Sequence, residues 1–226
     1  MKHPSGIKQV IVDKVVARRG RLHAYEQIVP VGTALVVVDL DAGTVGRMSD
    51  DTEILQIIDP INRMAAALRH HGGTVAWVTT PIKQASSNFR SIFGERTADE
   101  YEVEGRAGGT GTALWHSLEA EPGDVHVTKT RSSAFFPGNC NLHELLSDRS
   151  VDTVLIVGAV TNACCYATAV DAAELDYRVV MVSDAMQGHV HGLNEAALAT
   201  FFRVYGDVRP YTEVLELIVH EGAVAS

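Results

Sequence analysis

The sequence predicts an α/β protein built on a doubly wound, mostly parallel sheet with helices on both faces, a Rossmann-like three-layer arrangement. Two observations support this prediction. Four apolar runs are rich in β-branched residues and largely continuous, which is typical of strands covered on both faces. Helical stretches separate these runs along the chain. Strands that alternate with helices form right-handed crossovers, and such crossovers place the strands side by side in one open sheet.

The buried strands are expected where the apolar runs lie. These runs are Thr33–Leu40 (TALVVVDL), Gly73–Thr80 (GTVAWVTT), Val151–Ala159 (VDTVLIVGA) and Arg178–Ala185 (RVVMVSDA). A fifth run, Asp124–Thr130 (DVHVTKT), alternates more between apolar and polar residues. Alternation indicates a strand with one exposed face, so this strand is expected nearer an edge of the sheet.

Helix signals occur between the strands. Asp59 and Pro60 form an N-cap and first-turn pair for a helix over Ile61–His71. Asn141 and Glu144 have the spacing of a capping box at the start of a short helix. An Ala-rich stretch that is apolar nearly all round predicts a buried helix. That helix and two further ones are expected over Thr161–Asp176, Asn194–Tyr205 and Thr212–His220.

Two segments stand outside this alternation. Pro81–Gly111 is polar and contains glycine, and we interpret it as a long insertion that shapes a substrate lid. The first 21 residues hold six basic residues against the single acid Asp13, so 13 basic and 27 acidic residues lie beyond them. We therefore divide the chain into a basic arm (1–30) and a domain (31–226). The arm either lies against its own domain or a neighbouring subunit, or is a partly frayed terminus.

Composition narrows the class of protein. A chain of 226 residues fits one domain, and its net charge of −9 argues against a nucleic-acid partner. No apolar run reaches the roughly 20 residues that a membrane span needs, and no signal-peptide pattern is present. Three cysteines, two of them adjacent, do not form a disulfide framework. We expect a cytoplasmic protein that binds a small-molecule substrate and neither nucleic acid nor membrane.

Three reactive side chains are predicted at one edge of the sheet. In an open parallel sheet, ligands bind outside the carboxyl ends of the strands, and Asp39, Lys129 and Cys164 fall at or just beyond three such ends. Alone, each has an ordinary interpretation as a turn residue, a surface lysine or a small core residue. Together they suit covalent catalysis, in which a thiolate attacks, a cation lowers its pKa and a carboxylate carries the proton.

Three ordered motifs carry a resemblance to a known family. ALVVVDL (34–40), KTRSSAFF (129–136) and VGAVTNACCYATAVDA (157–172), followed by VVMVSDA (179–185), resemble the isochorismatase-like hydrolases. That family includes nicotinamidases, N-carbamoylsarcosine amidohydrolases and ureidoacrylate amidohydrolases. The resemblance runs from about residue 33 to the C-terminus. It implies an isochorismatase-like fold, no cofactor, and a homo-oligomer, either a dimer or a tetramer.

The resemblance also implies residue roles. Asp39 matches the proton-carrying aspartate, Lys129 the lysine that polarises the site, and Cys164 the nucleophile. The Val160–Thr161 bond matches a cis peptide, and the N–H groups of Thr161 and Cys164 match an oxyanion hole. The implied reaction is hydrolysis of a small linear amide, carbamoyl or ureido C–N bond through a covalent acyl-enzyme.

Three residues are expected to contact the substrate. Arg131 has the guanidinium that pairs a carboxylate with two hydrogen bonds, although a structural salt bridge explains it nearly as well. Phe135 is expected to wall the site, although core packing explains it equally well. Val160 lies at the turn that carries the nucleophile. A substrate that bears a carboxylate would fit this set.

The chain departs from the family's pattern in two places. Leu40-Asp41-Ala42-Gly43 (40–43) replaces a Met-Gln-Asn-like stretch and alters the pocket beside Asp39. TTPIKQASSNF (79–89) lacks the histidines of the nicotinamidase metal cluster, so no metal is expected. His189 and His191 are read as pocket or loop residues in preference to metal ligands.

Two other functions remain open at this stage. Isochorismatase-type members cleave a vinyl ether without a cysteine nucleophile, and Cys164 favours amide chemistry over that reaction. A catalytically silent binding module of the same fold is the other alternative, against which the intact trio argues. A nucleotide-binding site is disfavoured, because no Gly-x-Gly-x-x-Gly loop follows the first strand.

Overall fold

The computed structural model describes residue 3, residues 5–48 and residues 53–225, with side chains as far as residue 220. Its centre is a six-stranded parallel sheet in the order β3-β2-β1-β4-β5-β6. The strands are β1 (Thr33–Val38), β2 (Thr74–Thr79), β3 (Val125–Thr128), β4 (Thr153–Ala159), β5 (Arg178–Gln187) and β6 (Asp207–Arg209). The predicted doubly wound α/β fold is confirmed, and the strand order reverses between β1 and β4.

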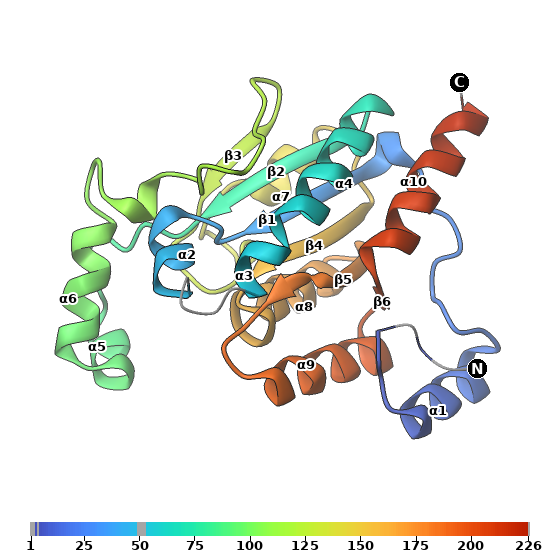
Figure 1. The fold of residues 1–226 in the computed structure, drawn as a ribbon, viewed down its shortest axis with the longest axis horizontal. Coiled ribbons are helices and arrows are strands. Elements are labelled where there is room, and N and C mark those ends of the chain that lie inside the picture. Colours follow the sequence, from blue (N-terminus) through green and yellow to red (C-terminus); the bar gives the residue numbers. More distant parts are fainter. Residues whose placement is uncertain (1–2, 4, 49–52, 226) are drawn as a thin grey trace.

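Helices form a layer on each face of the sheet (Figure 1). One layer contains α1 (Gln9–Arg19), α7 (Leu142–Ser147), α8 (Tyr166–Glu174) and α9 (His191–Val204). The other contains α2 (Ala42–Met48), α3 (Glu53–Gln56), α4 (Ile58–His70) and α10 (Tyr211–Ala225). No helix in the described part of the chain is long and apolar enough to cross a membrane.

The strand sequences are continuously apolar because each face of the sheet meets a separate hydrophobic cluster. In β1, Val36 packs into the cluster under α8 and α9, while the next residue, Val37, packs into the cluster under α4 and α10. In β4, Ile156 packs into the first of these clusters and Val157 packs into the second. Successive side chains of a strand point to opposite faces, so burial on both sides requires an unbroken apolar run.

The expected helix boundaries need three corrections. The stretch after β4 is not one α-helix: Thr161–Cys165 forms a π-helical turn, and α8 begins only at Tyr166. Helix α4 starts at Ile58, before the predicted Asp59 cap, because Ile58 and Ile61 are both buried against the sheet. Asn141 precedes α7 without forming a side-chain cap, since its backbone lies near the helical region and not in the extended one.

Strand β6 was not predicted from the sequence. It has three residues, and two of them, Asp207 and Arg209, are charged although both are buried. Neither the length nor the composition is typical of an interior strand. Its charged side chains are accommodated because they meet the N-terminal arm.

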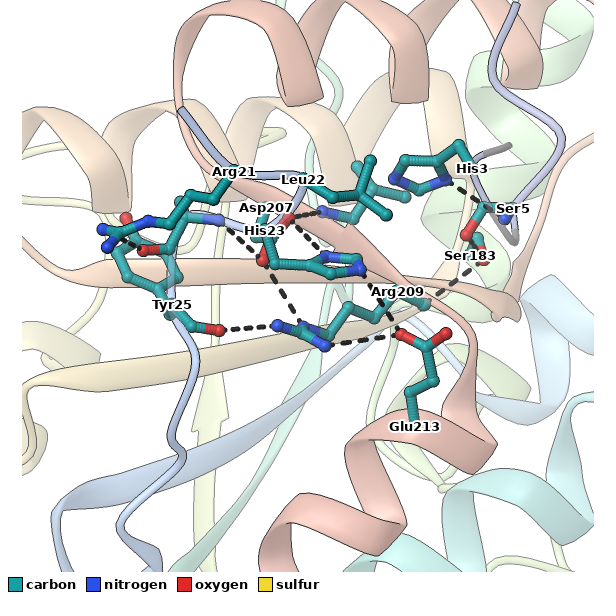
Figure 2. Close-up of polar contacts among 12 residues, drawn as sticks. His3, Ser5, Arg21, Leu22, His23, Tyr25, Ser183, Asp207, Arg209 and Glu213 are labelled. Carbon is teal, nitrogen blue, oxygen red and sulfur yellow. Dashed lines mark hydrogen bonds and ion pairs between the residues drawn. The ribbon is translucent and has the colours of Figure 1, made fainter. Parts of the chain in front are cut away.

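The arm lies against its own domain, one of the alternatives expected from the sequence. Ile7, Val12 and Val15 are buried on the layer that contains α9. The carboxylate of Asp207 contacts His23 Nδ1 at 3.1 Å and accepts the backbone N–H of residue 24 at 3.1 Å. Figure 2 shows His23 beside Asp207, and the partners of Arg209 on either side of its guanidinium. Apolar packing and polar contacts with the buried carboxylate of Asp207 therefore both attach the arm.

The predicted insertion is a helical hairpin. Helices α5 (Ser87–Phe93) and α6 (Glu95–Glu104) stand beyond the end of the sheet toward which the arrowhead of β2 points (Figure 1). Arg47 of α2 forms an ion pair with Glu104, and its guanidinium lies 4.1 Å from the centre of the Tyr101 ring. These contacts attach the hairpin to the body near the carboxyl ends of the strands.

Candidate active site

The candidate site lies where the strand order reverses, between the ends of β1 and β4. Asp39 follows β1 directly, and Val160 follows β4 directly. A Cβ at Gly158 would lie 2.1 Å from the carbonyl oxygen of Val38, so only glycine allows the two strand ends to approach this closely. In doubly wound sheets this reversal opens the crevice in which ligands bind.

Asp39 is held rigidly at this point. Its backbone has a φ of 52°, an uncommon left-handed conformation for a residue other than glycine, and its N–H donates to the carbonyl of Val78 at 2.8 Å. Oδ1 accepts the Thr80 hydroxyl at 2.6 Å, and Oδ2 accepts Lys129 Nζ at 2.7 Å. The carboxylate therefore has a fixed direction as well as a fixed position. Thr80 is the member of this network that the sequence did not single out.

Lys129 reaches this carboxylate from the edge of the sheet. It follows β3, which is separated from β1 by β2, and its side chain is completely buried. Nζ also donates to Thr80 Oγ1 at the end of β2. Burial lowers the pKa of Lys129, but the Asp39 carboxylate and the neighbouring Cys164 together hold that pKa above its ordinary value. The ammonium form is thus retained in a buried position.

Cys164 lies on the π-helical turn after β4 and is partly exposed. Burial and the Asp39 carboxylate raise the pKa of its thiol to about 12, while Lys129 opposes the rise. Both groups also interact with the thiol by hydrogen bonding. At neutral pH the sulfur is therefore protonated, with a carboxylate and an ammonium beside it. The structure brings the three predicted side chains together.

The turn around Cys164 differs from expectation by one residue. The cis peptide bond is Ala159–Val160, not the expected Val160–Thr161, so it directly follows the last residue of β4. The Val160 carbonyl accepts the N–H groups of Ala163 at 3.0 Å and Cys165 at 3.3 Å. Thr161 is 1% exposed, and its hydroxyl has no hydrogen-bond partner among the described residues.

Two of the expected substrate contacts have different surroundings. Arg131 is exposed and forms no ion pair within the described part of the chain, so the structural salt bridge is not observed. Phe135 is 4% exposed and packs in the core, with its ring 5.3 Å from that of Tyr177. Its expected place in the wall of the site is therefore corrected to the hydrophobic core.

The departure at residues 40–43 has a structural explanation. Asp41 accepts the backbone N–H of Thr44 at 2.8 Å and caps the start of α2. It is 3% exposed, and burial raises its pKa to about 6, against the Thr44 hydrogen bond and with a contribution from Asp39. An aspartate three residues before a backbone donor is a recognisable cap, so the sequence contained this signal.

The histidines after β5 lie at the surface. His189 is exposed, and His191 Nε2 lies 3.3 Å from Glu195 one helical turn along α9. Within the described residues, no three His, Cys, Asp or Glu side chains are arranged to hold a metal ion.

Fold and site together define an α/β protein with a thiol, a carboxylate and an ammonium at the switch point of a doubly wound sheet. The family model of the isochorismatase domain matches residues 33–212, and the chain belongs to the isochorismatase family of hydrolases.

Individual relatives agree with this assignment. The chain is 28% identical over 192 residues to the uncharacterized isochorismatase family protein YwoC of Bacillus subtilis (strain 168), covering 82% of this chain and 94% of that protein. It is 30% identical over 194 residues to the ureidoacrylate amidohydrolase RutB of Pseudomonas savastanoi pv. phaseolicola (strain 1448A / Race 6), covering 77% and 78%.

A solved structure shares the fold. The cysteine hydrolase from Pseudomonas syringae pv. phaseolicola 1448A superimposes with a TM-score of 0.78 over 89% of this chain and 99% of that chain. The two sequences are 22% identical, so this likeness supports the fold alone.

Proposed function

We propose that the protein is a cysteine-dependent amidohydrolase that cleaves a C–N bond of a small linear amide, carbamoyl or ureido compound. The observation that supports this proposal is the buried Asp39–Lys129 pair beside Cys164 at the reversal of strand order. The relationship to a ureidoacrylate amidohydrolase agrees with the same reaction class.

Because the pKa of Cys164 is raised, the first step must include removal of the thiol proton. A thiol with a pKa of about 12 is a poor nucleophile at pH 7, so its proton must leave as sulfur attacks the carbonyl carbon. Asp39 accepts this proton. Lys129 keeps the local charge balanced, because its ammonium stands beside the carboxylate and the developing thiolate. The N–H groups of Thr161 and Cys164 bind the oxyanion.

The intermediate then collapses with the same groups in reversed roles. The C–N bond breaks, and Asp39 passes its proton to the leaving nitrogen, which departs as ammonia or an amine. Sulfur is left acylated as a thioester. A water molecule attacks this carbonyl and gives a proton to Asp39, and the proton returns to sulfur when the acid leaves. No redox step or cofactor enters this cycle.

Ammonia release from a panel of small amides and ureido acids tests the proposal. The wild-type protein is compared with Cys164→Ala and with Cys140→Ala, a matched control because Cys140 is also partly buried and free. We expect release by wild type and by Cys140→Ala, and loss of at least about a thousandfold in Cys164→Ala, as when a covalent nucleophile is removed. Mass spectrometry should detect the acylated peptide that contains Cys164.

The opposite outcome is equally clear. Activity retained by Cys164→Ala rules out the covalent mechanism. If that activity is cleavage of a vinyl ether, it indicates the isochorismatase-type reaction. No release by the wild-type protein from any compound, together with a Cys164 that resists alkylation, indicates a silent binding module.

A further inference from the structure

A pocket of about 450 Å³ adjoins the candidate site on the side of the α5–α6 hairpin. Three parts of the chain line it: the loop after β2 (81–84), the segment after α6, and the end of β3 with the residues that follow it. Lys129 is one of the residues that follow β3. The volume lies in the range of small-molecule sites. Lys129 also donates to Asp39, so the pocket and the proposed reaction centre share this buried residue.

The pocket has a positive character in an acidic protein. Its lining contains Lys83 and Lys129 and no aspartate or glutamate. Arg106 and Arg131 immediately adjoin lining residues in the sequence, and both are exposed. Glu102 lies nearby in the hairpin, but its carboxylate is paired with Arg90 at 2.6 Å. In a chain of net charge −9, the exposed charge in the lining of this pocket is therefore the cation of Lys83.

These cations are not used by the fold. Within the described residues, the side chains of Lys83, Arg106 and Arg131 form neither an ion pair nor a hydrogen bond. Outside the arm, the side chain of Arg203 shares that property. Lys129 is different, since its charge is already matched by Asp39. Lys83 is therefore the cation of the lining that is free to bind a ligand.

We propose that this pocket holds a carboxylate of the substrate and that Lys83 is the specificity-determining residue that binds it. Lys83 lies three residues beyond Thr80, which contacts both Asp39 and Lys129, so a single loop connects the anion pocket to the reaction centre. Gln84 lines the same pocket, and its amide N–H group suits the remaining carboxylate oxygen. This inference rests on the proposed function but has a readout of its own.

Binding of succinate, measured by titration calorimetry on the full chain, tests the assignment without requiring turnover. Lys83→Gln removes the pocket cation, and Arg203→Gln is the matched control that removes an unpaired cation elsewhere. We expect wild type and Arg203→Gln to bind equally and Lys83→Gln to bind about tenfold more weakly, as for one lost hydrogen bond to a charged group. Lys83→Arg should bind nearly as wild type does.

Turnover gives the second readout. For the best anionic substrate, Lys83→Gln should raise KM about tenfold and leave kcat within about twofold, and for the matching carboxamide it should change neither. The assignment of the pocket is overturned if the wild-type protein does not bind succinate, or if Lys83→Gln and Arg203→Gln bind it equally. Turnover of the anionic substrate that does not depend on Lys83 overturns it as well, while the proposed function then stands.

Discussion

Lys129 illustrates how a single side chain can belong to two parts of the fold. Its backbone follows an edge strand, where a lysine is ordinarily solvated, yet its side chain is completely buried. It crosses the end of β2, donates to Thr80 and ends on Asp39. A buried ion pair contributes little net stability, because desolvation of both charges offsets their attraction. Retention of the pair therefore agrees better with a role in chemistry than with one in folding.

Asp41 should make stability depend on pH. Burial raises the pKa of its carboxyl from 3.8 to about 6, so its contribution to folding is complete below pH 3.8 and is lost as the pH rises through 6. Asp41→Asn keeps the oxygen that caps α2 but never ionises. We expect this variant to gain stability relative to wild type between pH 4 and pH 8, by up to about 3 kcal/mol.

Urea unfolding at both pH values measures this gain. Asp59→Asn is the control, because the side chain of Asp59 is 80% exposed on α4 and should produce no comparable pH-dependent gain. An Asp41→Asn variant whose advantage is the same at pH 4 and pH 8 would contradict the raised pKa.

The strands were predictable as elements, and the turns that carry chemistry were not. Each interior strand is an unbroken apolar run because both faces are covered, and that pattern can be read directly. The π-helical turn at Thr161–Cys165 has no such pattern, since its hydrogen bond from Cys165 to the Val160 carbonyl depends on how the chain leaves β4. The sequence therefore indicated the three reactive residues, placed the cis bond one residue too late, and did not indicate the partner Thr80.

The α5–α6 hairpin should loosen when its attachment to α2 is removed. Arg47 contacts both Glu104 and the Tyr101 ring, and few hairpin side chains are buried otherwise. A partly exposed cation–π contact contributes about 1 kcal/mol, so Arg47→Met should speed proteolysis within residues 81–111 about fivefold. Arg96→Met is the control, because Arg96 is 91% exposed and pairs only within α6. Equal cleavage of both variants would show that Arg47 does not attach the hairpin.

At the scale of the molecule, the order of apolar runs and helices in the sequence predicted the three layers. It did not predict where the N-terminal arm packs. The basic residues of the arm are numerous in the sequence, but only some of them attach it: Arg18 donates to the carbonyl of Arg203, and Arg19 lies over the Phe202 ring. The rest of the attachment comes from apolar residues of α1 and from contacts with Asp207. Counting charges in the sequence does not identify a buried partner 184 residues away. The position of β6 was missed for the same reason, since its buried charges find several of their partners in the arm.

The arm should therefore unfold together with the body. Val15 is 1% exposed and packs into the cluster that contains α9, whereas Val10 on the same helix is 60% exposed. Val15→Ala should lower the free energy of unfolding by about 2 kcal/mol, and Val10→Ala should change it by less than about 0.5 kcal/mol. Tryptophan fluorescence reports the unfolding of the body in urea, because Trp77 is buried in the opposite cluster and Trp115 packs against that cluster. A shift of that transition by Val15→Ala alone shows that arm and body form one cooperative unit, and no shift by either variant shows that the arm opens independently.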